Sequence, residues 1–354
     1  MIRARGLLER LPVSGRVLRT IDALRQERDG LRAQRDRLQD QLVRQEEAAG
    51  LAAVTSGRPP KVLLAPSFLA HTERLRRIRG VSREMNGHAD AVWEYNSKPA
   101  GVALARELGL RVPEQLSPPR PLHVVMPPTG QPCVIKPTSG AASRGVSPLV
   151  PAAGGRWLNL FEQDRGPQSW EAIRESLERL VRDGSTASEF LIEELLPGHE
   201  AAHLPYDWKL LCIGGAVVLT FVRDSGGKRF NRDSRYRWFD RDWHDLGPIR
   251  NPDQVDPSLP EPQHPAELVR VAEQIARVLP SVFVRIDLFD TPDGVVFGEI
   301  TPQPGTPLWF GADLDRRLGE MWDRAEARTW ARTDRPSSKP SSSEDASETE
   351  ANTP

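Results

Sequence analysis

The stretch VRIDLFDTPDGVVFGEIT, residues 284–301, decides the fold. In its first half, apolar residues alternate with Arg285 and Asp287, and this period of two predicts a strand that carries both polar side chains on one face. The Asp-Gly pair at 293–294 predicts a tight turn into a second strand, which brings Glu299 back toward Asp287.

Two carboxylates on adjacent strands form the kind of all-oxygen site that Mg²⁺ prefers. Arg285 beside them is placed to face phosphate oxygens. The alternative is a surface ion pair between Arg285 and Asp287 with an exposed Glu299. The apolar flanks disfavour that alternative, because unpaired buried acids are costly.

A lysine followed by a loop of small residues precedes this pair of strands. In CVIKPTSGAASRGV, residues 133–146, an apolar strand delivers Lys136 and Pro137 ends it. Small residues allow backbone N–H groups to approach an anion closely, and the lysine adds charge. The segment is therefore a candidate phosphate cradle, and it fits a flexible surface loop equally well.

A third motif, FLIEELLPG at residues 190–198, is an apolar strand that ends in two acids and leaves at Pro-Gly. As structure alone, it is an edge strand and a turn. As a site, it supplies backbone hydrogen bonds for a purine and a carboxylate for ribose.

The order of these motifs resembles the ATP-grasp superfamily. The segments DWKLLCIGG (207–215), VRD (222–224) and EIT (299–301) look like the TupA-like branch, whose members are associated with teichuronopeptide and other cell-surface polymer synthesis. The resemblance covers roughly residues 96–324. It implies an α+β ATP-grasp fold in which two α/β lobes hold ATP between them.

The resemblance also implies a role for each matched residue. ATP phosphates would contact Lys98, Lys136 and a covering loop that includes Ser139, Gly140, Ser143 and Gly145. The adenine hinge would be Glu194 and Leu196, and the ribose acid would be Glu200, with Glu193 as the alternative. The transferred phosphate would contact Arg285, Lys209 would make a further contact with phosphate or substrate, and Mg²⁺ would be held by Asp287, Glu299 and Thr301. Many superfamily members have Asn where this chain has Thr301, and a hydroxyl is the weaker ligand, so binding of two metals is less secure.

The activity that the resemblance implies is carboxylate–amine ligation with ATP and Mg²⁺. A carboxylate would attack the γ-phosphate of ATP to give an acyl phosphate, which an amine converts to an amide. The alternatives are a phosphotransferase of the same fold and a non-catalytic coiled-coil assembly protein. A polyanionic polymer acceptor is a further candidate partner, because a basic stretch follows a strand, although an ordinary solvated loop explains that stretch equally well. The stretch contains Arg223, Lys228, Arg229, Arg232 and Arg235.

Patterns outside the motifs divide the chain further. Residues 1–20, with five arginines, are a basic amphipathic lead-in that suits either an anionic membrane surface or solvent. Residues 21–48 continue a heptad pattern typical of a homodimeric coiled coil; arginines in the seam and Gly30 weaken it, and a single helix packed on the catalytic domain is the alternative. The remaining predicted parts are a linker at 49–60, an N-terminal pre-grasp region at 61–130, the ATP-grasp domain at 131–330 and a disordered tail at 331–354.

Composition narrows the function classes. The formal net charge of -1 opposes bulk nucleic-acid binding, which needs a basic surplus. No apolar stretch reaches the length of a membrane span, so we expect a cytoplasmic protein, with contact at the inner membrane surface left open by the lead-in. Cys133 and Cys212 lie in apolar runs and are expected to be buried thiols rather than a disulfide or a metal site.

Overall fold

The structure is a computed structural model that describes residues 65–87, 90–140, 143–199, 204–224, 234–304 and 308–333. The chain divides into two units, Met1–Ala65 and Pro66–Pro354, and the description below concerns the second. In the first unit only Gln26, Gly30, Gln34 and Ala65 are described, and the first three of these are helical. The rest of the predicted coiled coil, lead-in and linker lies outside the described residues, as does the predicted tail after Thr333.

The first sheet is antiparallel, with the strand order β1-β5-β2-β3-β4. Its strands are β1 (Gln115–Pro121), β2 (Cys133–Pro137), β3 (Ser147–Ala152), β4 (Arg156–Asn159) and β5 (Glu189–Glu194). β1 contains three prolines and lies at the edge, where a strand needs only one row of backbone hydrogen bonds. Helix α6 (Trp170–Arg182) packs on this sheet through a stripe at helical spacing, formed by Trp170, Ile173 and Leu177.

The second sheet is also antiparallel, with the order β10-β9-β6-β7-β8. Its strands are β6 (Tyr206–Ile213), β7 (Ala216–Asp224), β8 (Arg235–Phe239), β9 (Phe283–Thr291) and β10 (Gly294–Thr301). Helix α7 (Pro265–Val278) covers one face, and its apolar stripe joins the alternate strand residues in one core. That core includes Leu268, Ala272, Ile275, Leu210, Ile286 and Leu288.

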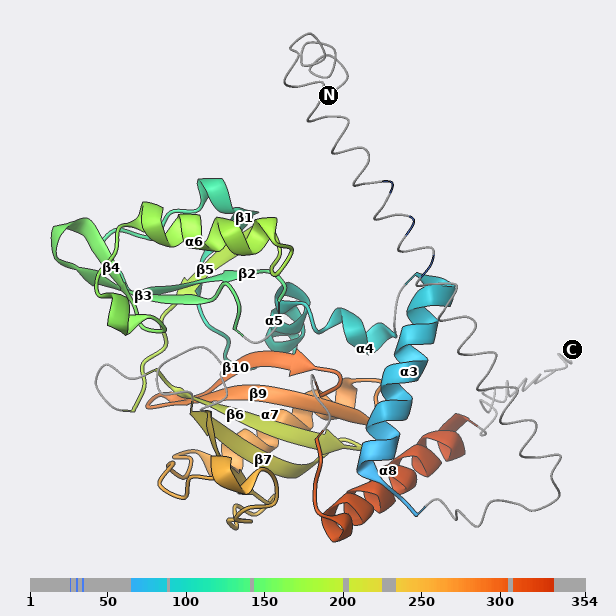
Figure 1. Cartoon of the computed structure of the whole chain (residues 1–354). Helices are drawn as coiled ribbons and strands as arrows, with labels where there is room; N and C mark the ends of the chain where they lie inside the picture. The colour runs from blue at the N-terminus through green and yellow to red at the C-terminus, as the bar shows by residue number, and fades with distance from the viewer. Residues whose placement is uncertain are drawn as a thin grey trace, which may run out of the picture. The chain divides into compact units, whose positions relative to one another are not determined.

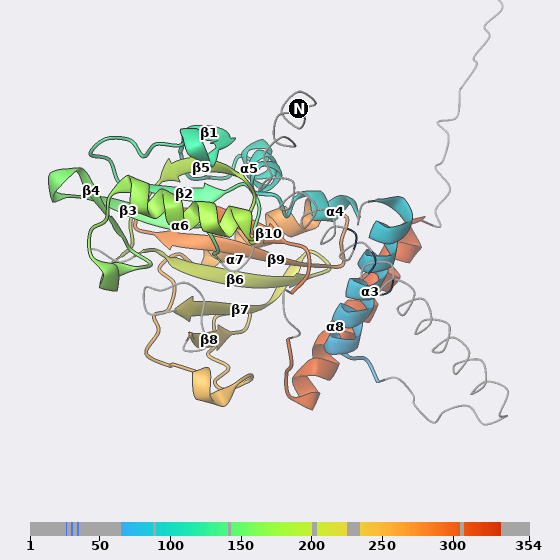
Figure 2. The same cartoon turned by 45° about the horizontal axis from the view of Figure 1, so that its top comes forward.

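Two helices cover part of the opposite face of the second sheet. Helices α3 (Phe68–Asn86) and α8 (Ala312–Thr333) lie side by side in both views (Figures 1 and 2). The Phe68 ring lies 5.6 Å from the Phe283 ring and 6.0 Å from the Trp322 ring. Gly319 permits the close approach of the two segments, because a Cβ there would lie 2.3 Å from the Ser67 nitrogen. Helix α8 runs past residue 330, where the predicted domain ends.

Short helices lead from α3 into the first sheet. They are α4 (Ala91–Glu94) and α5 (Lys98–Glu107), and α5 packs against β10, where Gly101 faces the Phe297 ring. Single 3₁₀ turns complete the described elements, at Leu122–Val124, Ala153–Gly155, Gln163–Arg165 and Pro252–Gln254.

The chain enters the first sheet once, before β1, and leaves it once, after β5. These two connections are hydrogen-bonded to each other. The Glu194 backbone N–H donates to the Glu114 carbonyl at 2.9 Å, and the Glu114 N–H donates to the Glu194 carboxylate at 2.8 Å. The first connection is also tied to β10, because the Phe297 N–H donates to the Arg111 carbonyl at 2.9 Å.

Both cysteines are buried free thiols, as predicted. Burial raises the pKa of the Cys133 thiol to about 12. Across the described ranges, we find no helix with the length and apolar character needed to cross a bilayer.

Candidate active site

A β-bulge brings two predicted metal ligands together on the second sheet. Phe297 pairs with Leu288, but Glu299 pairs with Asp287, so Gly298 is passed over in the register. Residues paired across two strands share a face of the sheet. The bulge therefore places the Glu299 and Asp287 carboxylates on the same face.

Glycine is required at the bulge. A Cβ on Gly298 would lie 2.8 Å from the Asp287 carbonyl oxygen. The same register shift places Thr301 opposite Arg285. Without it, Glu299 would stand opposite Ile286, on the face that α7 covers.

The three predicted metal ligands all accept hydrogen bonds from one guanidinium, that of Arg285. Its Nε donates to Asp287 Oδ1 at 2.5 Å, and its Nη2 donates to Asp287 Oδ2 at 2.7 Å. The same Nη2 donates to Glu299 Oε1 at 3.1 Å and to Thr301 Oγ1 at 2.9 Å. A positive charge thus lies at the point where these oxygens converge.

Lys209 extends this network onto β6. Its ammonium donates to Asp287 Oδ2 at 2.5 Å and to Asp207 Oδ2 at 2.6 Å, and Lys209 is 4% exposed. Asp207 Oδ1 is buried and has no hydrogen-bond partner among the described residues. The network therefore contains one carboxylate oxygen that these residues leave unsatisfied.

The two acids of the β9–β10 pair have opposite pKa shifts. Burial alone would raise the pKa of Asp287, but Arg285 and Lys209 outweigh it and hold that pKa well below its usual range. Burial and the nearby Asp287 charge raise the pKa of Glu299, although solvent reaches 43% of its side chain and weakens the effect. Glu299 is thus the acid that gains most from an additional cation.

Lysines link this network to the first sheet. The Lys136 ammonium pairs with the Glu193 carboxylate at 2.5 Å, with both side chains largely buried. Lys98, at the start of α5, has its pKa lowered by burial and by the Lys136 charge, while Glu299 and Glu193 oppose that change. Lys98 therefore interacts with acids of both sheets, Glu193 on the first and Glu299 on the second.

The predicted phosphate-covering loop is anchored at both ends. Residues 141–142 are outside the described residues, but the Ala187 N–H donates to the Ser139 carbonyl at 3.3 Å. At the other end, Ser143 and Gly145 have positive φ, of 56° and 74°. Gly145 is also confined, because a Cβ there would lie 3.1 Å from Thr186. Gly140, directly after Ser139, is exposed.

The predicted adenine hinge leaves β5 toward the second sheet. Leu196 is buried, and Glu194 is held by Glu114 as described above. Beyond it, His199 lies 3.7 Å from the buried Asp290 carboxylate, which also binds His264 at 2.7 Å. Glu200, the predicted ribose acid, lies outside the described residues. Glu193, the alternative, is paired with Lys136.

The residues present fit a hard cation. Asp287, Glu299 and Thr301 offer two carboxylates and a hydroxyl, and the Arg285 guanidinium demonstrates that a positive group is accommodated among them. In the described part of the chain, no three His, Cys, Asp or Glu side chains gather to hold a metal. This donor set suits Mg²⁺, which keeps several water or phosphate ligands rather than a full protein cage.

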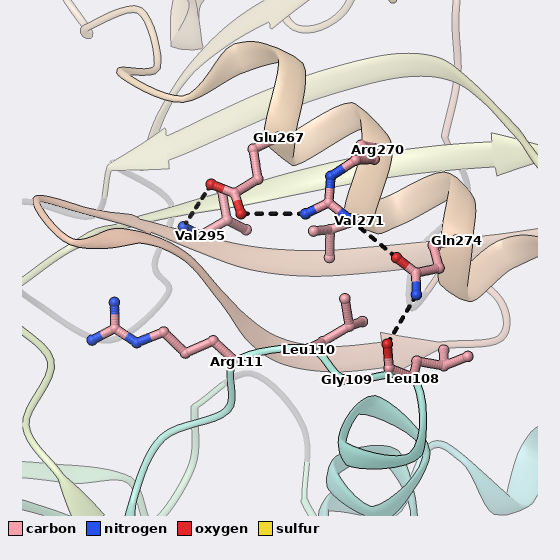
Figure 3. Close-up of a pocket in the computed structure, with 9 residues that line it drawn as sticks. All are labelled: Leu108, Gly109, Leu110, Arg111, Glu267, Arg270, Val271, Gln274 and Val295. Carbon is pink, nitrogen blue, oxygen red and sulfur yellow. Dashed lines mark hydrogen bonds and ion pairs between the residues drawn. The ribbon is translucent and has the colours of Figure 1, made fainter.

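A hollow of about 280 Å³ lies elsewhere, between the end of α5, α7 and β10 (Figure 3). Its polar lining groups bind each other: Gln274 donates to the Leu108 carbonyl at 3.0 Å, and Arg270 pairs with Glu267 at 3.3 Å. None of the predicted site residues lines it, so it does not belong to the candidate site.

Three features of the site are absent from the sequence prediction. They are the buried Asp207 Oδ1, the bulge at Gly298, and Arg79 on α3. Arg79 is 3% exposed, donates to the Pro302 carbonyl at 2.8 Å and pairs with Asp90 at 2.7 Å. It thereby fixes the loop that follows Thr301. The alternation of Asp207 with Lys209 was a signal for the first feature, because alternate strand residues share a face.

Comparison with known proteins identifies one matching family model. The model, described as TupA-like ATPgrasp, matches residues 125–323. A search of the curated proteins finds no match.

Solved structures with partial similarity are ligases. A D-alanine–D-alanine ligase from Bacillus anthracis complexed with ATP is 15% identical, with a TM-score of 0.42, over 72% of this chain and 76% of that one. The ATP-grasp ligase PsnB complexed with its minimal precursor is 17% identical, with a TM-score of 0.36, over 77% and 76%. An L-amino acid ligase from Bacillus licheniformis is 13% identical, with a TM-score of 0.39, over 64% and 46%.

Proposed function

The chain belongs to the TupA-like ATP-grasp family, and from that premise we propose that it is an ATP-dependent carboxylate–amine ligase that uses Mg²⁺. The observation that carries the proposal is the Arg285 network. It gathers two acids, a hydroxyl and a buried lysine on one face of the second sheet, beside the lysines that join it to the first sheet.

Each member of the network has a proposed task. Lys98 and Lys136 bind ATP phosphates, and the Ser139–Gly145 loop closes over them. Asp287, Glu299 and Thr301 hold Mg²⁺, which supplies positive charge to the oxygens of the transferred phosphoryl group. The backbone of the Glu194–Leu196 hinge binds adenine, and Glu200 or Glu193 binds ribose.

Arg285 and Lys209 act on the transferred phosphoryl group. The substrate carboxylate oxygen forms a bond to the γ-phosphorus as the bond to the ADP oxygen breaks. The guanidinium and ammonium stabilise the charge that spreads over the phosphoryl oxygens, which is the main source of rate in such transfers. An amine then displaces phosphate from the acyl phosphate and forms an amide.

Cell-surface polymer synthesis is the proposed setting, because this is the process associated with the TupA-like family that the sequence resembles. The basic stretch after β7 is the proposed contact for a polyanionic acceptor, and residues 21–48 are the proposed dimer contact. The proposed location is the cytoplasm, with the basic lead-in at the inner membrane surface.

A substrate screen tests the proposed function. Amino-acid and uronate carboxylates are paired with amines, and ADP formation is measured with MgATP. We expect ADP only when a carboxylate and an amine are both present. A stable phosphoester formed without amine would instead identify a phosphotransferase.

Matched variants separate catalysis from assembly. Glu299→Gln removes a metal-binding charge and is expected to lower ADP formation by about 10²-fold or more. Glu261→Gln makes the same change on a side chain that is 70% exposed and is expected to retain full activity. If no pair of substrates yields ADP and Glu299→Gln leaves cellular function intact, the chain is an assembly protein and not a ligase.

A further inference from the structure

The strand order of the second sheet gives the active site two sides. Glu299 lies on β10, where it interacts with Lys98, and Asp287 lies on the adjacent strand β9. Lys209 and Asp207 lie on β6, the next strand across. Asp207 is therefore on the far side of the network from the phosphate-binding lysines.

We propose that Asp207 Oδ1 accepts a hydrogen bond from an N–H of the amine substrate. The amine subsite is then the part of β6 that borders β7. This inference rests on the proposed ligase function. An in-line transfer places the attacking carboxylate opposite the departing ADP. With ADP on the β10 side, the acyl phosphate and the incoming amine lie on the Asp207 side.

The chemistry of Asp207 fits a hydrogen-bond donor that carries positive charge. One carboxylate oxygen accepts from Lys209 at 2.6 Å, while the other is buried and has no partner in the part of the chain that the structure describes, although the Asp207 side chain as a whole is 29% exposed. A buried acceptor without a donor is costly, and such atoms in folded proteins are commonly explained by function. An ammonium or amine N–H supplies the missing donor and leaves the Lys209 contact in place.

In this proposal, Asp207 and Glu299 bind different groups. Asp207 pairs with Lys209 on its own strand β6, whereas Glu299 on β10 pairs with Arg285 on β9.

The amide-forming step keeps Asp207 charged throughout. The bound ammonium loses one proton to solvent, and its nitrogen lone pair attacks the acyl carbon. The carbon–nitrogen bond forms, the carbon–oxygen bond to phosphate breaks, and phosphate leaves with the electron pair and the second amine proton. Asp207 orients the nitrogen through a remaining N–H.

Asp207→Asn tests the subsite by comparing two nucleophiles in the MgATP reaction. One is the amine that supports ADP formation, and the other is hydroxylamine, which is small and mostly uncharged at neutral pH and traps acyl phosphate as a hydroxamate. We expect the KM for the amine to rise about 10- to 100-fold, which is the effect of losing a charged hydrogen bond. The rate of hydroxamate formation is also expected to decrease, but by a factor about ten times smaller than the decrease in the rate of amide formation. Asp242→Asn is the matched control, because its side chain is 71% exposed. Asp207→Ser repeats the test if the Asn variant does not fold.

A second readout needs no turnover. Ethylammonium chloride is expected to raise the melting temperature of wild type and of Asp242→Asn, but not of Asp207→Asn. Tetramethylammonium chloride, which has no N–H, is expected to have no such effect at equal ionic strength. The subsite is overturned if Asp207→Asn responds like wild type, if wild type does not respond, or if amide and hydroxamate formation fall together with an unchanged KM for the amine. A failure of the ligase proposal would appear differently, as absence of ADP and hydroxamate in wild type, and the ethylammonium readout would still decide the subsite.

Discussion

Replacing Gly298 by alanine tests whether the β-bulge builds the active site. The new Cβ would lie 2.8 Å from the Asp287 carbonyl oxygen and 3.2 Å from the Phe289 ring, and ordinary contact begins near 3.4 Å. The backbones of β9 and β10 must therefore separate by roughly half an ångström, or the bulge must be lost. Either change moves Glu299 relative to Asp287.

The expected loss of activity exceeds the loss of stability. Overpacking of this kind costs about 1–3 kcal/mol of unfolding free energy. A misplacement near 1 Å at reacting groups costs about 10²-fold in rate, so we expect ADP formation to fall at least about tenfold at temperatures where the variant is fully folded. Loss of the bulge would be more severe, because Glu299 would then point toward α7.

Urea unfolding and ADP formation are measured on the same preparations. Gly80→Ala is the control, since nothing lies within 4 Å of a Cβ there and Ala favours a helix over Gly by about 1 kcal/mol. It is expected to be stabilising and fully active. The reasoning is refuted if the unfolding free energy of Gly298→Ala lies within about 0.5 kcal/mol of wild type and the variant forms ADP at the wild-type rate.

Two further predictions concern charge. The folded-state pKa of Glu299 lies above its ordinary value of 4.5, so folding favours its neutral form and the contribution of Glu299 to stability falls as pH rises from below 4.5 through the folded pKa. Glu299→Gln removes that loss. In metal-free urea titrations from about pH 4 to 8, the unfolding free energy of the variant should therefore increase relative to that of wild type as pH rises. A difference in unfolding free energy that does not change with pH would contradict the raised pKa. Arg79→Ala should lower the unfolding free energy by about 1–3 kcal/mol, because the buried Pro302 carbonyl loses its hydrogen-bond donor. Arg77→Ala, on the exposed side of α3, should keep the unfolding free energy within about 0.5 kcal/mol of wild type. Equal urea midpoints for the two arginine variants would contradict this role for Arg79.

Local patterns predicted much of the fold. The strands around Arg285 and Asp287 follow from periodicity, and the family match confirms the predicted ATP-grasp assignment. These elements are predictable because burial of a single face imposes a period of 3.6 or 2 on the residues themselves.

Contacts between distant segments were not predictable in the same way. The partner of Lys136 is Glu193, and the loop after Thr301 is held by Arg79 from α3. Neither contact leaves a periodic mark, because each joins residues far apart in sequence. The bulge at Gly298 has a local sequence signal, an isolated glycine inside a strand pattern. Which face of the sheet carries Glu299, however, depends on the register with the neighbouring strand.

The hydrogen bonds between Glu114 and Glu194 limit how the two sheets can move. The segment from α5 into β1 and the segment from β5 toward β6 meet at this point. Two connections that are hydrogen-bonded to each other at one place act as a hinge. They leave chiefly one rotational degree of freedom between the first sheet and the second. Lys136 and Glu193 then travel on an arc toward or away from Lys98 and Glu299, while the spacing of Arg285, Asp287 and Lys209 within the second sheet stays fixed.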